Sequence, residues 1–214
     1  GMLSACASDS GSGSSDKGAT SKSEGHASQV TVSMPVSSEP AAGFDPFVSW
    51  GCGEHVHEPL IQSTLLTTTA DMGFENDLAT AYSCSDDGLT WTFTIRTDAK
   101  FTNGKAINGV ANSEASECDL TMVDKAVAVD DETCEIHLNK PFNAFLYTLA
   151  VIGIVPDGGH GSDYGTNPIG SGRYMLEQWD HGQQVILKAN PDYYGDAPKI
   201  DRVVVVFMEE DASL

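Results

Sequence analysis

The sequence is poor in basic residues. It has 214 residues, with 11 lysines and arginines against 31 aspartates and glutamates, which gives a formal net charge of −20. Proteins that bind nucleic acid neutralise phosphates with clustered lysine and arginine, so we expect no nucleic-acid partner. Hydrophobic residues still make up 40% of the chain, which is enough to build a buried core at this length.

The sequence also lacks long hydrophobic runs and familiar catalytic motifs. No apolar run approaches the roughly 20 residues that a membrane-spanning helix needs. There is no Gly-x-Ser-x-Gly, no His-Glu-x-x-His and no phosphate-binding loop of the Walker type. These absences favour a binding protein over an enzyme, and any ATPase that works with it would be a separate chain.

The first 28 residues have the composition of a flexible tether. Residues 8–28 are mostly serine, glycine, alanine and charged residues without a large apolar side chain, so they bury too little surface to become ordered. The preceding Leu3-Ser4-Ala5-Cys6 resembles a bacterial lipobox, in which the cysteine is lipidated. We expect residues 1–28 to be a lipobox remnant and tether that anchor the chain to the membrane through Cys6. The alternative is a chance match in a serine-rich tail.

Four further cysteines lie in the body of the chain. An exported protein can oxidise Cys52, Cys84, Cys118 and Cys134, and four cysteines allow three disulfide connectivities. The sequence does not choose among these connectivities. Buried free thiols are the alternative.

Alternating apolar and polar residues predict three β-hairpins, which indicate a mixed α/β fold. The first joins residues 79–85 to 90–96 through the turn Asp86-Asp87-Gly88, a strong hairpin signal. The second joins residues 122–129 to 133–138, and the third joins residues 174–179 to 185–189. We also expect strands at residues 29–34, 65–69, 151–155 and 200–208, and helices at residues 54–66 and 141–150.

Three blocks of the chain together resemble one protein family. They are residues 78–104 with their Asp-Asp-Gly hairpin, residues 130–145, and residues 167–174 (Asn-Pro-Ile-Gly-Ser-Gly-Arg-Tyr) continued by residues 190–201. In this spacing they resemble the family 5 extracellular solute-binding proteins of ABC importers. The two glycines of the third block, Gly170 and Gly172, are expected to supply conformational freedom before a strand.

The resemblance implies an α/β fold of the periplasmic-binding-protein type (type II), with a mixed sheet and β-hairpins. Members of this family have two lobes that close on a ligand, and this chain is less than half their length. We therefore expect residues 29–214 to be the first lobe, truncated before the second. A single lobe should bind its ligand weakly, because half of the contacts are missing.

The resemblance also implies a function outside the membrane. We expect the substrate-binding component of an ABC importer, lipid-anchored and extracytoplasmic, which captures oligopeptides or dipeptides and delivers them to permease subunits. One alternative within the family is a receptor for nickel or a metallophore. An alternative from another class is an extracytoplasmic metallo-hydrolase, which would need a metal with an open coordination position.

The densest group of candidate ligand-binding residues is Trp50, Gly51, Cys52 and His55, on a loop that runs toward the ligand cleft in the family. Trp50 could form an aromatic wall, or it could belong to the core. Cys52, His55 and His57 are good ligands for nickel or another transition metal. The alternative is a helix start with surface histidines. We expect no resident cofactor, because a metal would be the cargo.

Arg173 is the remaining candidate for ligand binding. It stands where most relatives have proline before the tyrosine. Its guanidinium could pair with a ligand carboxylate through two parallel hydrogen bonds. In so acidic a chain, a structural ion pair is the alternative.

Overall fold

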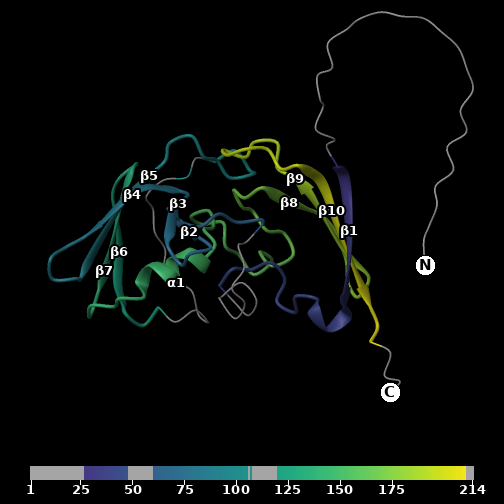
Figure 1. The fold of residues 1–214 in the computed structure, drawn as a ribbon, viewed down its shortest axis with the longest axis horizontal. Coiled ribbons are helices and arrows are strands. Elements are labelled where there is room, and N and C mark those ends of the chain that lie inside the picture. Colours follow the sequence, from purple (N-terminus) through teal and green to yellow (C-terminus); the bar gives the residue numbers. More distant parts are fainter. Residues whose placement is uncertain (1–26, 48–59, 106, 108–119, 211–214) are drawn as a thin grey trace, which may run out of the picture.

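The computed structural model describes residues 27–47, 60–105, 107 and 120–210. Figure 1 shows two four-stranded sheets at opposite ends of the molecule, with the helix α1, a two-stranded sheet and loops between them. The strands are β1 (Ala27–Pro35), β2 (Leu66–Thr68), β3 (Phe74–Asn76), β4 (Ala79–Cys84), β5 (Thr90–Ile95), β6 (Val123–Asp130), β7 (Thr133–Leu138), β8 (Tyr174–Asp180), β9 (Gln184–Ala189) and β10 (Ile200–Met208). The helices are η1 (Val36–Ser38), a 3₁₀ turn, and α1 (Phe145–Val151).

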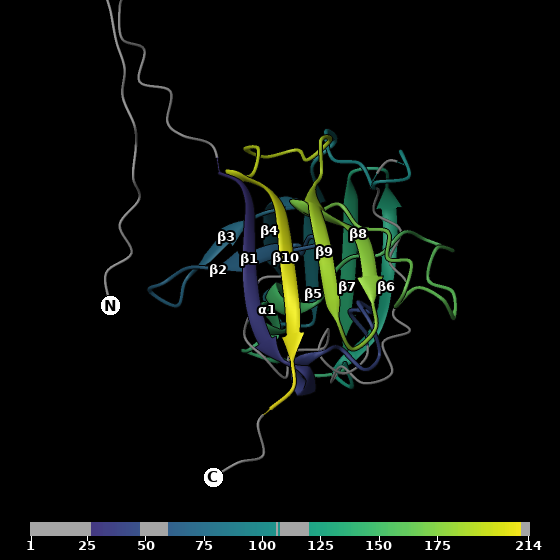
Figure 2. The same ribbon diagram turned by 90° about the vertical axis from the view of Figure 1, so that its right-hand side faces the viewer.

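The first sheet has the strand order β1-β10-β9-β8 and faces the viewer in Figure 2. β1 pairs with β10 in parallel, and the other pairs are antiparallel. The strands predicted at residues 29–34 and 200–208 and the hairpin of β8 and β9 are thereby confirmed. One face of the sheet packs Tyr174, Val185, Leu187 and Phe207 into a core with Ile61.

The second sheet has the order β4-β5-β7-β6 and is antiparallel throughout, which confirms the other two hairpins. Asp87 shapes the first turn, because its carboxylate accepts hydrogen bonds from Ser85 Oγ (2.6 Å) and Leu89 N (3.0 Å). Side chains two residues apart share a face of a strand. Phe93 and Ile95 are therefore buried together on the core face.

The second sheet's core is closed by α1, which is shorter than predicted. The helix begins at Phe145 rather than near residue 141, and it buries Phe145 and Leu149. The strand predicted at residues 151–155 is wrong, since Val151 ends α1 and residues 152–155 pair with no strand in the described part of the chain. The N–H of Ile154 donates instead to the carbonyl of Ser63 (2.8 Å).

The helix predicted over residues 54–66 is also wrong where the structure describes it. Residues 60–65, here called the central segment, have no helical turn, and β2 begins at Leu66. The segment's carbonyl groups bond to other parts of the chain, so they are not used within a helix. Five of these carbonyl groups accept hydrogen bonds from backbone N–H groups: Leu60 from Tyr174, Ile61 from Gly172, Ser63 from Ile154, Thr64 from Leu78, and Leu65 from both Asp77 and Ala79. The central segment thus ties the two sheets together.

Gly170 and Gly172 are needed because the central segment passes so close to them. A Cβ at Gly170 would lie 2.0 Å from Ile61 O, and a Cβ at Gly172 would lie 2.3 Å from Leu60 O. Neither glycine has a positive φ. The expected role in conformational freedom is therefore corrected, since these positions require a small residue for a close approach of two backbones.

Cys84 and Cys134 both carry free thiols, the first exposed and the second buried. Burial raises the pKa of the Cys134 thiol, which keeps it protonated. Cys52 and Cys118 lie outside the described residues. No helix in the described part of the chain is long and apolar enough to cross a membrane.

Candidate functional site: a polar pocket around Arg173

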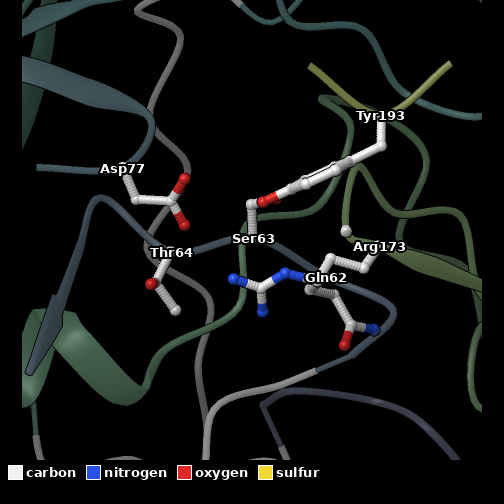
Figure 3. Close-up of a pocket in the computed structure, with 7 residues that line it drawn as sticks. Gln62, Ser63, Thr64, Asp77, Arg173 and Tyr193 are labelled. Atoms are coloured by element: carbon white, nitrogen blue, oxygen red, sulfur yellow. The ribbon is translucent and has the colours of Figure 1, made fainter. Parts of the chain in front are cut away.

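A small polar pocket lies beside the central segment, between the chain segments that lead into β4 and β8 (Figure 3). Its cavity volume is about 10 Å³, which is room for about one water molecule. A solute could therefore contact it with only one polar end. The lining residues are Gln62, Ser63, Thr64, Asp77, Gly172, Arg173 and Tyr193.

Arg173 projects into this pocket from a backbone that is fixed on both sides. It directly precedes β8, and its carbonyl accepts a hydrogen bond from Asn190 N (2.8 Å). The Asn190 side chain donates to Gly172 O (2.9 Å). The guanidinium carbon lies 5.7 Å from the centre of the Tyr193 ring, and Figure 3 shows the side chain extending toward the central segment. These two hydrogen bonds from Asn190 hold the backbone of Gly172 and Arg173 in place, and with it the base of the arginine side chain.

The central segment supplies a wall of buried polar side chains. Gln62, Ser63 and Thr64 are 6%, 4% and 1% exposed. Gln62 Nε2 donates to Phe44 O (2.8 Å) and to the hydroxyl of Tyr164 (3.2 Å). Because buried polar groups are costly unless they are hydrogen-bonded, such bonds make the wall rigid. Our sequence analysis missed these three residues, although a polar triplet between two apolar pairs was a visible signal.

Asp77 is the acidic residue of the pocket, and Tyr194 orients it. The hydroxyl of Tyr194 donates to Asp77 Oδ1 (2.5 Å). Burial, and then this bond to the carboxylate, raise the pKa of Tyr194, so it stays a donor at neutral pH. The guanidinium of Arg96 lies 4.2 Å above the Tyr194 ring, a cation–π contact that fixes the ring. The pocket thus combines a cation and an anion, each on a fixed frame.

The structure places one of the predicted site residues, Arg173, and puts it in this pocket. Trp50, Gly51, Cys52, His55 and His57 lie outside the described residues, as does Cys6. In the ranges that the structure describes, no group of three or more histidine, cysteine and acidic residues could hold a metal ion. The metal-binding hypothesis for the histidine cluster therefore stays a prediction.

The chain that leads toward the histidine cluster is anchored at its last described residues. Asp45 Oδ2 lies 2.7 Å from His160 Nε2, and Asp45 Oδ1 accepts a hydrogen bond from Phe47 N (2.9 Å). The Phe47 ring also packs on His160, with ring centres 4.7 Å apart. Residues 45–47 are thereby held against the loop that leads to Arg173.

Two curated proteins share substantial sequence with this chain. The probable D,D-dipeptide-binding periplasmic protein DdpA of Escherichia coli is 36% identical over 163 residues, which are 65% of this chain and 31% of that protein. The glutathione-binding protein GsiB of Salmonella choleraesuis is 35% identical over 151 residues, which are 62% of this chain and 30% of that protein. The matched part is about a third of each relative's length.

A solved structure and a family profile agree with these relatives. NikZ from Campylobacter jejuni, in complex with Ni(L-His), superposes with a TM-score of 0.73 at 23% identity, covering 85% of this chain and 39% of that one. This likeness confirms the predicted periplasmic-binding-protein fold. The profile of the bacterial extracellular solute-binding proteins, family 5, matches residues 73–214. The chain therefore belongs to the family 5 bacterial extracellular solute-binding proteins.

Proposed function

We propose that this chain is part of the substrate-binding component of an ABC importer, and that it captures oligopeptides or dipeptides outside the membrane. The names of the two curated relatives support the solute class, since a dipeptide and glutathione are both short peptides with free carboxylates. In this proposal residues 29–214 form the first lobe. Residues 1–28 tether it to a lipid anchor at Cys6, and permease subunits receive the peptide.

The observation that carries the peptide proposal is the placement of Arg173. Arg173, a half-buried residue, stands beside a polar wall in a chain with a net charge of −20. Among so many acidic residues, a fixed arginine is a distinctive place for a carboxylate to bind. The two parallel N–H groups of its guanidinium match the two carboxylate oxygens. We propose that the terminal carboxylate of the peptide binds Arg173, while the rest of the peptide lies outside the small cavity.

Isothermal titration of a dipeptide and of its C-terminal amide tests this role. A hydrogen bond to a charged group contributes about 1.5–3 kcal/mol, so the amide should bind about 10- to 100-fold more weakly. Arg173→Ala should weaken binding of the acid by the same factor and leave binding of the amide unchanged.

Arg202→Ala is the matched control, because Arg202 pairs with Glu177 at 3.0 Å on β8, away from the pocket. It should bind both ligands as the parent chain does. Equal affinity of the parent chain for acid and amide would refute the role of Arg173. A loss in Arg202→Ala as large as that in Arg173→Ala would refute it as well.

A further inference from the structure

Asp77 and Arg173 bring opposite charges to one pocket, which has room for about one water molecule. Figure 3 shows both side chains directed into this pocket, Asp77 from the chain before β4 and Arg173 from the chain before β8. Both residues are half-buried, and opposite charges attract strongly across a small, partly buried cavity. The Asp77 carboxylate can therefore act as a counterion of the guanidinium, where the carboxylate of a ligand would bind.

The backbone of Asp77 is held in place beside the pocket. Asp77 N donates to Leu65 O (3.1 Å), and the next residue, Leu78, donates through its N–H to Thr64 O (3.2 Å). Leu78 is also fully buried in the core of the second sheet. The carboxylate of Asp77 can therefore change its position only by rotation of its own side chain, so the partners of that carboxylate decide how it meets Arg173.

Tyr194 holds one of the two oxygens of this carboxylate. Its hydroxyl donates to Asp77 Oδ1 (2.5 Å), and its ring packs on the core of the second sheet and lies 4.2 Å from the guanidinium carbon of Arg96. Arg96 is itself fixed by Asp98, to which it donates from Nε (2.6 Å) and Nη2 (2.9 Å). Because the bond from Tyr194 already stabilises the negative charge of Asp77, the carboxylate gains less from contact with Arg173.

We propose that Asp77 determines how tightly this site binds an anionic solute, because its carboxylate competes with the carboxylate of the ligand for Arg173. Tyr194 is the positioning residue that limits this competition, since it holds one oxygen of Asp77. The proposal rests on the proposed function, in which the terminal carboxylate of a peptide binds Arg173. It adds that the affinity for this carboxylate is set by a residue that the ligand displaces from the arginine.

Isothermal titration of a dipeptide and of its C-terminal amide against three variants tests the competition. Asp77→Asn keeps the size of the side chain and removes its charge, so the acid should bind about tenfold more tightly and the amide should change by less than about twofold. Tyr194→Phe frees Asp77 to engage Arg173, so the acid should bind several-fold more weakly. In the double variant Asp77→Asn/Tyr194→Phe, loss of the hydroxyl should have no further effect on binding of the acid.

Asp87→Asn is the matched control, because it also removes one negative charge but lies beyond the far end of β4, in the turn to β5. It should bind the acid as the parent chain does, since salt screens a distant charge. Two results would overturn the proposal. One is an affinity for the acid that Asp77→Asn leaves unchanged, and the other is an equal gain in Asp87→Asn. In a parent that prefers the acid to the amide, both results refute the role of Asp77 and leave the role of Arg173 intact.

A double-mutant cycle without ligand tests the interaction of Asp77 with Arg173 independently of any peptide. Urea denaturation followed by circular dichroism compares the parent, Asp77→Asn, Arg173→Ala and the double variant, and it also shows that each variant is folded. Arg173→Ala should lower the folding equilibrium constant several-fold more in the parent than in the Asp77→Asn background, because only the parent loses an attraction between opposite charges. Equal effects of Arg173→Ala in the two backgrounds would overturn the proposal.

Discussion

The substitution Gly170→Ala should strongly destabilise the fold, although it adds only one methyl group. The new Cβ would lie 2.0 Å from Ile61 O and 2.7 Å from Ile61 C, and both atoms belong to the backbone. A flexible side chain could turn away, but the central segment is held by hydrogen bonds to Tyr174, Gly172 and Ile154. Relief of the clash therefore requires a shift that breaks some of these bonds.

The size of the effect follows from this geometry. Overpacking a core typically costs about 1–3 kcal/mol, and a contact between two backbones belongs at the upper end. A buried donor or acceptor that loses its partner adds about 1–3 kcal/mol. We expect Gly170→Ala to lower the free energy of unfolding by about 3 kcal/mol or more, which is about a hundredfold in the folding equilibrium. Urea denaturation followed by circular dichroism measures it.

Gly104→Ala is the matched control for this prediction. Gly104 has a φ of +81° and no atom within 4 Å of an added Cβ, so alanine there meets only the backbone penalty of about 1–2 kcal/mol for a left-handed residue. Gly170 has no such φ, but it has the clash. If Gly170→Ala costs no more than Gly104→Ala, the two backbones are not packed as described and the reasoning is refuted.

Two further substitutions test the contacts that hold the loops around the first sheet. Hydrogen bonds from Gly182 N and Trp179 Nε1 lower the pKa of Glu39 below its ordinary 4.5. The charged Glu39 carboxylate therefore stabilises the fold fully at neutral pH, and this stabilisation is lost as the pH falls through the lowered pKa. Glu39→Gln should reduce the difference between the urea midpoints at pH 7 and pH 3. Tyr164→Phe removes a buried hydroxyl that donates to Ile169 O (2.8 Å) and accepts from Gln62, so the free energy of unfolding should fall by about 1–3 kcal/mol. This loss should be the same at pH 6 and pH 9, because burial raises the pKa of Tyr164 to about 12.

The hairpins were predictable because their information is local. Alternating side chains define each strand, and the Asp87 carboxylate that shapes the first turn bonds within two residues of itself. The central segment was not predictable in this way. Its residues could have formed a helix, but their carbonyls bond to Tyr174, Ile154 and Leu78, which are distant in sequence. Long-range pairing overrode local propensity there.

The site was only partly predictable for the same reason. Arg173 was singled out because it departs from the family pattern, and the structure places it in a pocket. The polar wall of Gln62, Ser63 and Thr64 was missed, since these residues were assigned to a helix, in which a polar triplet does not stand out. The roles of Gly170 and Gly172 also depend on a segment more than a hundred residues away. Family membership could be inferred from three separated blocks, whereas the ligand could not.

The measurement that tests the central claim most directly is native mass spectrometry of the protein, purified gently from cell extract. We expect a spread of adducts with the masses of short peptides, and these adducts should disappear when the protein is denatured. A single adduct of metal mass that His55→Ala or His57→Ala abolishes would contradict peptide capture and make the chain a metal receptor. A bare protein that takes up no added dipeptide would contradict it too.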